Sequence, residues 1–137
     1  MSLTGMREWE ARLKAIPEAM KQAAQTAIDQ NAEELVTAMK ATVPKRTGTL
    51  ESTIRSEPLD GGRIGRVIMA GGVKTTKVVR NSEKGNAPTF DYALAAEFGK
   101  DGRPGANFFY GNYRLRRRRI RGRLTRAINK AAKLGRS

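Results

Sequence analysis

Eight arginines within thirteen residues near the C-terminus give this sequence its most concentrated chemistry. Guanidinium groups stay charged and make bidentate contacts with phosphate and carboxylate groups, so they favour contact with nucleic acid or with an acidic protein surface. A merely solvated helix face is the weaker interpretation, because so many like charges repel one another and need a counter-charge. The candidate contact residues are Arg114, Arg116, Arg117, Arg118, Arg119, Arg121, Arg123 and Arg126.

The positive charge is gathered at one end of the chain. Residues 100–137 hold 13 Lys or Arg and one Asp, a net charge of +12, whereas residues 1–99 hold 14 basic and 12 acidic residues, a net charge of +2. No aromatic array or asparagine-rich face accompanies the arginines, so we expect no reading of bases. Any contact with DNA or RNA is expected at the phosphate backbone and is expected to weaken with salt.

Other residues offer little chemistry. The absence of His and Cys excludes histidine bases, thiolate metal sites and cysteine nucleophiles. Asp91 and Glu97 are six residues apart and do not share a helix face, so we expect a helix cap from Asp91 and an ion pair from Glu97 to the basic tail. The glycine pairs 61–62 and 71–72 lack the spacing of a phosphate-binding loop and predict turns. We therefore expect no catalytic, cofactor-binding or metal-binding residues, and no enzyme.

The length of 137 residues predicts one domain, residues 1–137. Its expected parts are an N-terminal arm with a short helix at 1–16, a helix-plus-sheet body at 17–107 and a basic helix at 108–137. No apolar run reaches the roughly 18 residues of a membrane span, and the N-terminus lacks the apolar stretch of a signal peptide. We expect a protein that is kept in the cytosol or in an assembly built there, with no membrane partner.

Apolar spacing and breaker residues predict the elements in more detail. Three- and four-residue steps with abundant Ala predict a long helix over 17–43, ended by Pro44. A turn at Thr47 and Gly48, with Leu50 and Ile54 pointing inward, leads to a meander of strands at 54–59, 63–70 and 73–79. A polar loop at 80–90, a short helix at 91–98, a second loop at 99–107 and a helix at 108–134 complete the chain.

The order of these motifs resembles that of a known family. The long helix is followed by Val43-Pro44-Lys45-Arg46-Thr47-Gly48-Thr49-Leu50, then by strands, Asp91-Tyr92-Ala93 and Glu97-Phe98-Gly99. A Gly/Pro loop, Phe108 and the basic helix come last. The sequence is similar, over about residues 6–134, to the gene-product-ten-like tail-completion proteins of long-tailed bacteriophages.

This resemblance implies an α+β fold, in which the long N-terminal helix and the basic C-terminal helix pack on a small antiparallel sheet. It also implies a non-enzymatic virion protein that joins head and tail as a subunit of a neck or tail-completion ring, here expected as a hexamer and assembled in the bacterial host cytoplasm. The implied partners are the head connector, adaptor or stopper and the tail tube or terminator proteins. The basic helix itself allows either non-specific contact with packaged DNA or a contact with an acidic connector, and the sequence leaves both open. A small basic nucleic-acid-binding protein is the alternative function. The expected structural positions at sheet and loop junctions are Pro44, Thr47, Gly48, Leu50, Tyr92, Glu97, Phe98 and Gly99.

Overall fold

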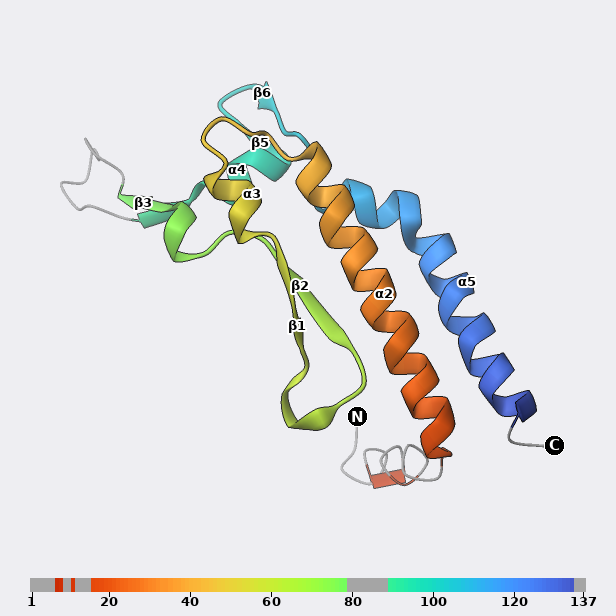
Figure 1. Ribbon diagram of the computed structural model, residues 1–137. Coiled ribbons are helices and arrows are strands. Elements are labelled where there is room, and N and C mark those ends of the chain that lie inside the picture. Colours follow the sequence, from red (N-terminus) through yellow and green to blue (C-terminus); the bar gives the residue numbers. More distant parts are fainter. Residues whose placement is uncertain (1–6, 9–10, 12–15, 79–88, 135–137) are drawn as a thin grey trace.

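Two long helices dominate the fold. The structure is a computed structural model, and it describes residues 7–8, 11, 16–78 and 89–134. Helix α2 (Glu18–Thr42) and helix α5 (Tyr110–Leu134) each have 25 residues and are therefore about 37 Å long. They lie side by side and run antiparallel (Figure 1). The sequence prediction of helices over 17–43 and 108–134 is confirmed to within two residues at each end.

Helix α2 is the central element because its small side chains let its neighbours approach closely. Its buried residues are mostly alanines in the first half and larger side chains, Leu35 and Met39, in the second half. Pro17 stands at the N-cap position, where its missing N–H is not needed, and Pro44 follows the C-cap residue Val43. The two prolines therefore set both ends of the helix.

A β-hairpin lies on the other side of α2 from α5 (Figure 1). Strands β1 (Arg55–Pro58) and β2 (Arg66–Met69) pair antiparallel, with Arg55 opposite Met69, and are joined through the 3₁₀ turn η1 (Asp60–Gly62). Helix α2 is therefore packed between a hairpin and a second helix.

The predicted three-stranded meander is wrong. Strand β3 (Thr76–Val78) follows the 3₁₀ turn η2 (Val73–Thr75) and pairs antiparallel with β4 (Thr89–Asp91) instead of with β2. Gly71 and Gly72 have φ values of +88° and +130°, which turn the chain away from β2. Asp91 then accepts hydrogen bonds from Gly72 N and Thr75 Oγ1, which hold β4 beside β3.

The remaining short elements close one end of the helix pair. They are helix α3 (Thr49–Thr53), helix α4 (Tyr92–Phe98) and the two-residue strands β5 (Gly99–Lys100) and β6 (Arg103–Pro104), which pair antiparallel. The core forms where these elements meet α2, and it comprises Leu35, Met39, Val43, Leu50, Ile54, Ala93 and Phe108. The described residues thus form an α+β fold with three separate two-stranded antiparallel sheets, which confirms the predicted fold class.

Two predicted segments cannot be compared with the structure. Most of the short helix of the 1–16 arm and most of the loop at 80–90 lie outside the described residues. Residues 89 and 90, assigned to that loop from the sequence, belong to β4.

Candidate functional site

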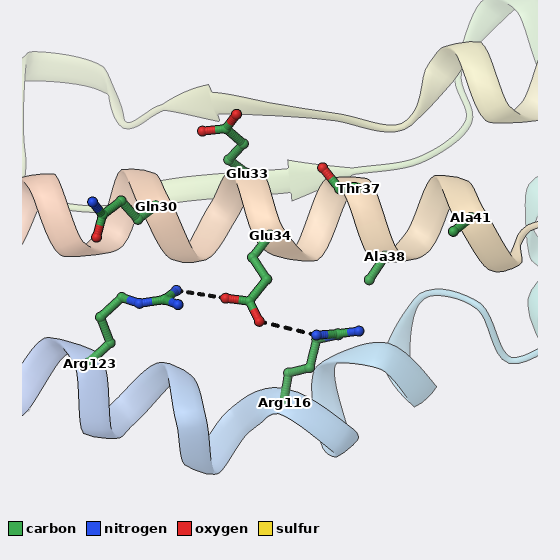
Figure 2. Close-up of a pocket in the computed structure, with 8 residues that line it drawn as sticks. All are labelled: Gln30, Glu33, Glu34, Thr37, Ala38, Ala41, Arg116 and Arg123. Atoms are coloured by element: carbon green, nitrogen blue, oxygen red, sulfur yellow. Dashed lines mark hydrogen bonds and ion pairs between the residues drawn. The ribbon is translucent and has the colours of Figure 1, made fainter.

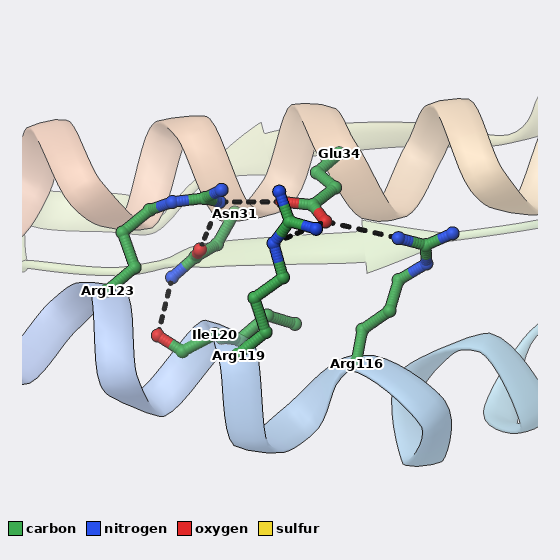
Figure 3. Close-up of polar contacts among 6 residues, drawn as sticks. All are labelled: Asn31, Glu34, Arg116, Arg119, Ile120 and Arg123. Carbon is green, nitrogen blue, oxygen red and sulfur yellow. Dashed lines mark hydrogen bonds and ion pairs between the residues drawn. The ribbon is translucent and has the colours of Figure 1, made fainter.

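Three of the predicted contact arginines meet one carboxylate between the two long helices. Glu34 on α2 lies 3.1 Å from Arg116 Nη1, 3.3 Å from Arg119 Nε and 2.7 Å from Arg123 Nη1 (Figure 3). Arginines at positions i, i+3 and i+7 lie along one face of a helix, so the spacing aims all three at α2. Only 18% of the Glu34 side chain is exposed, which protects these contacts from solvent.

We refer to Glu34 and the three arginines that contact it, Arg116, Arg119 and Arg123, as the clamp. Neighbouring polar groups extend this clamp along the interface between α2 and α5. Asn31 accepts a hydrogen bond from Arg123 Nη1 at 2.7 Å and donates one to the Ile120 carbonyl at 3.1 Å (Figure 3). Asn112 near the beginning of α5 donates to Thr42 Oγ1 at 2.7 Å, close to the end of α2. Polar contacts thus join α2 and α5 at Asn31 and again where Asn112 meets Thr42, in addition to the apolar packing of the two helices.

The clamp determines the ionisation of Glu34. The hydrogen bond from Arg123 outweighs desolvation and, with the nearby charge of Arg119 and the hydrogen bond from Arg116, holds the pKa of Glu34 below its usual range. Glu34 is therefore a carboxylate at neutral pH. One negative charge faces three positive ones, and Arg116 Nε has no hydrogen-bond partner among the described residues.

A hollow of about 650 Å³ opens beside this clamp. Glu34, Arg116 and Arg123 line one part of it, and Thr37, Ala38 and Ala41 continue it along α2 (Figure 2). Glu33, next in sequence to Glu34, points away from α5 (Figure 2). The hollow is open to solvent, and three of its charged side chains, Glu34, Arg116 and Arg123, contact one another.

Four other arginines lie on the opposite side of α5. Arg114, Arg117, Arg118 and Arg121 follow the i, i+3, i+4, i+7 pattern of one helix face, and all four are exposed. We refer to them as the outward stripe. Within the described part of the chain, no acidic side chain forms an ion pair with any of the four. Arg126, also exposed, lies farther along the helix.

Glu97 has a different partner from the predicted one. Its buried carboxylate accepts hydrogen bonds from the backbone N–H groups of Phe109 at 2.7 Å and Tyr110 at 3.3 Å. The predicted ion pair to the basic tail is wrong among the described residues, because these N–H groups at the start of α5 lack partners in the helix and attract a negative charge. Glu97 instead fixes the beginning of the arginine-bearing helix.

Asp91 caps α4, as the sequence predicts. Its carboxylate accepts from Ala93 N at 2.9 Å, from Gly72 N at 2.9 Å and from the Thr75 hydroxyl. Desolvation raises the pKa of Asp91, but the hydrogen bonds from Thr75, Ala93 and Gly72 outweigh it and leave the pKa below its usual range. Both carboxylates that could have formed an acid–base pair are therefore committed to backbone contacts.

Apolar side chains gather on the surface next to the start of α5. Leu94 is 65% exposed, Phe98 is 63% exposed and Tyr110 is 46% exposed. The rings of Phe98 and Tyr110 stack with centroids 5.9 Å apart, and all three side chains line a cavity of about 480 Å³. We refer to Leu94, Phe98 and Tyr110 as the aromatic patch. Three exposed apolar side chains in one place are typical of a surface that another protein covers.

Comparison with known proteins identifies the family. The family model described as "Bacteriophage HK97-gp10, putative tail-component" matches residues 7–99, which is more than half of the chain. The chain belongs to the HK97 gp10-like family. This confirms the resemblance found in the sequence and gives the protein a place among phage tail components. No curated protein and no solved structure matches the chain.

Several motif residues of the HK97 gp10-like resemblance lie at or beside helix ends. Gly48, with a φ of +77°, precedes α3, and Thr47 Oγ1 accepts a hydrogen bond from Thr49 N. Leu50 is buried in the core and Tyr92 begins α4. Gly99 ends α4 with a φ of +89°, and a side chain there would collide with the carbonyl of Arg103.

The match to the HK97 gp10-like family ends at residue 99, so it does not include the arginine helix. The sequence indicated the arginines as contact residues, but it did not indicate Glu34 and Asn31, which hold three of these arginines against α2. The available signal was the i, i+3, i+7 spacing of Arg116, Arg119 and Arg123, together with a glutamate on the alanine-rich helix.

Two further observations concern sites that the described residues could hold. No group of three or more His, Cys, Asp or Glu within them is arranged to hold a metal ion. None of the helices they form has the length and apolar character needed to cross a membrane.

Proposed function

We propose that this chain is a non-enzymatic structural protein of the virion that joins the phage head to the tail, as one subunit of a closed ring. Membership of a phage tail-component family supports the structural role. We propose that the ring is a hexamer, since closed cyclic symmetry is the common form of such assemblies. Its neighbours are a head connector, adaptor or stopper on one side and a tail tube or terminator on the other. The virion is the protein's location, and assembly takes place in the bacterial host cytoplasm.

The aromatic patch is the observation that carries this proposal. Leu94 and Phe98 are one helical turn apart on α4, and Tyr110 reaches the same surface from the start of α5. A protein that acts alone gains nothing from leaving these side chains in water, whereas a subunit buries them against a neighbour. Aromatic residues are enriched at the centres of protein interfaces, which fits this use.

The positions of the two carboxylates support a role without catalysis. Asp91 caps α4 and Glu97 caps α5, so each is used to fix a helix end beside the aromatic patch. A carboxylate that already accepts two or three hydrogen bonds is poorly placed to take a proton from a substrate.

Deletion of the gene in its parent phage or prophage tests the proposal. The lysate is examined by negative-stain electron microscopy, with complementation by the intact gene as the control. Separate heads and free tails, restored to joined particles by complementation, would support a protein of the joint. Intact, infectious and normally joined particles would contradict it and would favour the alternative, a small basic nucleic-acid-binding protein that acts outside the virion.

A further inference from the structure

We propose that the outward stripe of α5, formed by Arg114, Arg117, Arg118 and Arg121, binds the phosphate backbone of duplex DNA. This inference rests on the proposed function in one respect, since a subunit of the joint lies on the route that DNA takes between head and tail. The chemistry itself is carried by the arrangement of the arginines.

The arginines of α5 are divided between two faces with different electrostatic surroundings. Arg116, Arg119 and Arg123 face α2 and share the carboxylate of Glu34. The outward stripe faces solvent and has no ion pair with the described residues. Helix α5 itself contains no acidic residue. The counter-charge that four neighbouring guanidinium groups require therefore comes from outside the described fold.

The residues around the outward stripe favour a phosphate backbone over an acidic protein surface. Protein–protein interfaces that contain arginine normally also contain apolar anchor residues. Leu115, the most exposed apolar residue of α5, lies about 110° around the helix from the midline of the stripe, as the 3.6-residue turn requires. Thr125, next along the stripe, is polar and exposed. Tyr110 and Tyr113, which are 46% and 42% exposed, border the stripe, and the rest of the contact area is charged and polar, as protein–DNA interfaces are.

Duplex DNA fits the stripe better than a single strand does. Single strands are held by stacking of bases on aromatic side chains. The aromatic residues beside the stripe are Tyr110 and Tyr113, and the Tyr110 ring already stacks on Phe98. Four arginines within eight residues of one helix span about 10 Å along a straight axis, which suits a regular array of phosphates.

Binding of this kind has a defined salt dependence. Each neutralised phosphate contributes about −0.9 to the slope of log K against log[salt], so four contacts predict a slope of about −3.6. The affinity is then about 100-fold weaker in 200 mM than in 50 mM salt. Binding is expected to be the same for duplexes of unrelated sequence, because no base is read.

Fluorescence anisotropy of the purified full chain with a labelled 30-base-pair duplex tests the proposal. The stripe variant carries Arg114→Gln, Arg117→Gln, Arg118→Gln and Arg121→Gln. The matched control removes four exposed cations elsewhere by Arg46→Gln, Arg63→Gln, Lys74→Gln and Arg103→Gln, so both variants have a net charge of +10 instead of +14. Thermal unfolding followed by circular dichroism shows whether each variant folds.

We expect the stripe variant to lose at least 10-fold in affinity at 50 mM salt and most of the salt slope, while the control keeps the slope of the parent chain. Equal losses in the two variants would overturn the assignment, because binding would then follow net charge alone. The parent chain gives a second test that does not depend on any variant folding. A slope shallower than about −2, or no binding at 50 mM salt, would also overturn the proposal and would favour an acidic protein partner. Neither result bears on the deletion experiment, so failure of DNA binding is distinguishable from failure of the head–tail role.

Discussion

Glu34 and Arg123 lie on opposite helices, 89 residues apart in the sequence, and their side chains are 2.7 Å apart. The same carboxylate also receives Arg116 and Arg119, so one acidic residue orients three arginines of a helix that has no acid of its own. This contact fixes which face of α5 turns toward α2. The opposite face, with the outward stripe, is thereby presented to whatever lies outside.

Removal of the Glu34 charge is expected to weaken the helix pair. In Glu34→Gln, the partly buried guanidinium groups of Arg116 and Arg123 and the exposed one of Arg119 lose their shared counter-charge. We expect a loss of about 1–2 kcal/mol in the free energy of unfolding. Urea unfolding measures the change. Glu33→Gln is the matched control, because Glu33 is exposed and points away from α5, and we expect a change within about 0.5 kcal/mol. Equal stability of the two variants would show that the clamp contributes nothing.

The same contact predicts a pH dependence. The folded-state pKa of Glu34 is lowered, so its contribution to stability is present above the unfolded-state pKa of about 4.3 and is lost as the pH falls through the folded value. The difference in free energy of unfolding between the parent chain and Glu34→Gln should be constant from pH 7 to about pH 5 and should shrink below pH 4. Asp91 titrates in both proteins, so its effect cancels. A difference that grows on acidification would contradict the assignment.

Gly71 is expected to tolerate no side chain. Its φ is +88°, and an added Cβ would lie 2.5 Å from Asp91 Oδ2 and 2.9 Å from the Ala93 Cβ. Gly61 has a similar φ of +71°, but nothing lies within 4 Å of an added Cβ. Both alanine variants pay roughly 1 kcal/mol for left-handed backbone, and only Gly71→Ala adds a steric cost of about 1–3 kcal/mol. Urea unfolding of the two variants side by side checks the difference, and a Gly71→Ala protein as stable as Gly61→Ala would refute it.

The aromatic patch is expected to matter for assembly more than for folding. Leu94→Ser and Phe98→Ser remove side chains that are more than 60% exposed, so we expect a loss of about 1 kcal/mol or less in the free energy of unfolding. We expect the double variant to leave heads and tails separate when it complements the deletion. Ile64→Ser, at an exposed position beside the tip of the β1–β2 hairpin, is the control and should restore joined particles. Normal joining by the double variant would show that the patch is not an interface.

The helices were predictable because their signals are local. Pro17 and Pro44 bracket α2, and apolar residues recur at helical spacing between them, so sequence alone predicts its extent to within one residue at each end. The N-cap role of Asp91 was predictable for the same reason. The pairing of β3 with β4 was not, because it depends on how Gly71 and Gly72 turn the chain and on hydrogen bonds from residues 72 and 75 to Asp91.

Only part of the chemistry of the basic helix could be predicted from the sequence. The arginine cluster stands out by composition, but its division into two faces depends on Glu34 and Asn31, which lie more than 80 residues away. Likewise Glu97 could be recognised as a residue with a partner, whereas the partner proved to be the backbone at the start of α5. Long-range contacts of this kind follow from the packing of α2 against α5.

The most direct test of the head–tail role is the position of the protein in the finished particle. A phage that carries an affinity tag on this chain, labelled with gold and examined by electron microscopy, gives that position. The account predicts gold at the junction between head and tail in joined particles. Gold at the distal tip of the tail, along the tube, or absent from purified particles would contradict it.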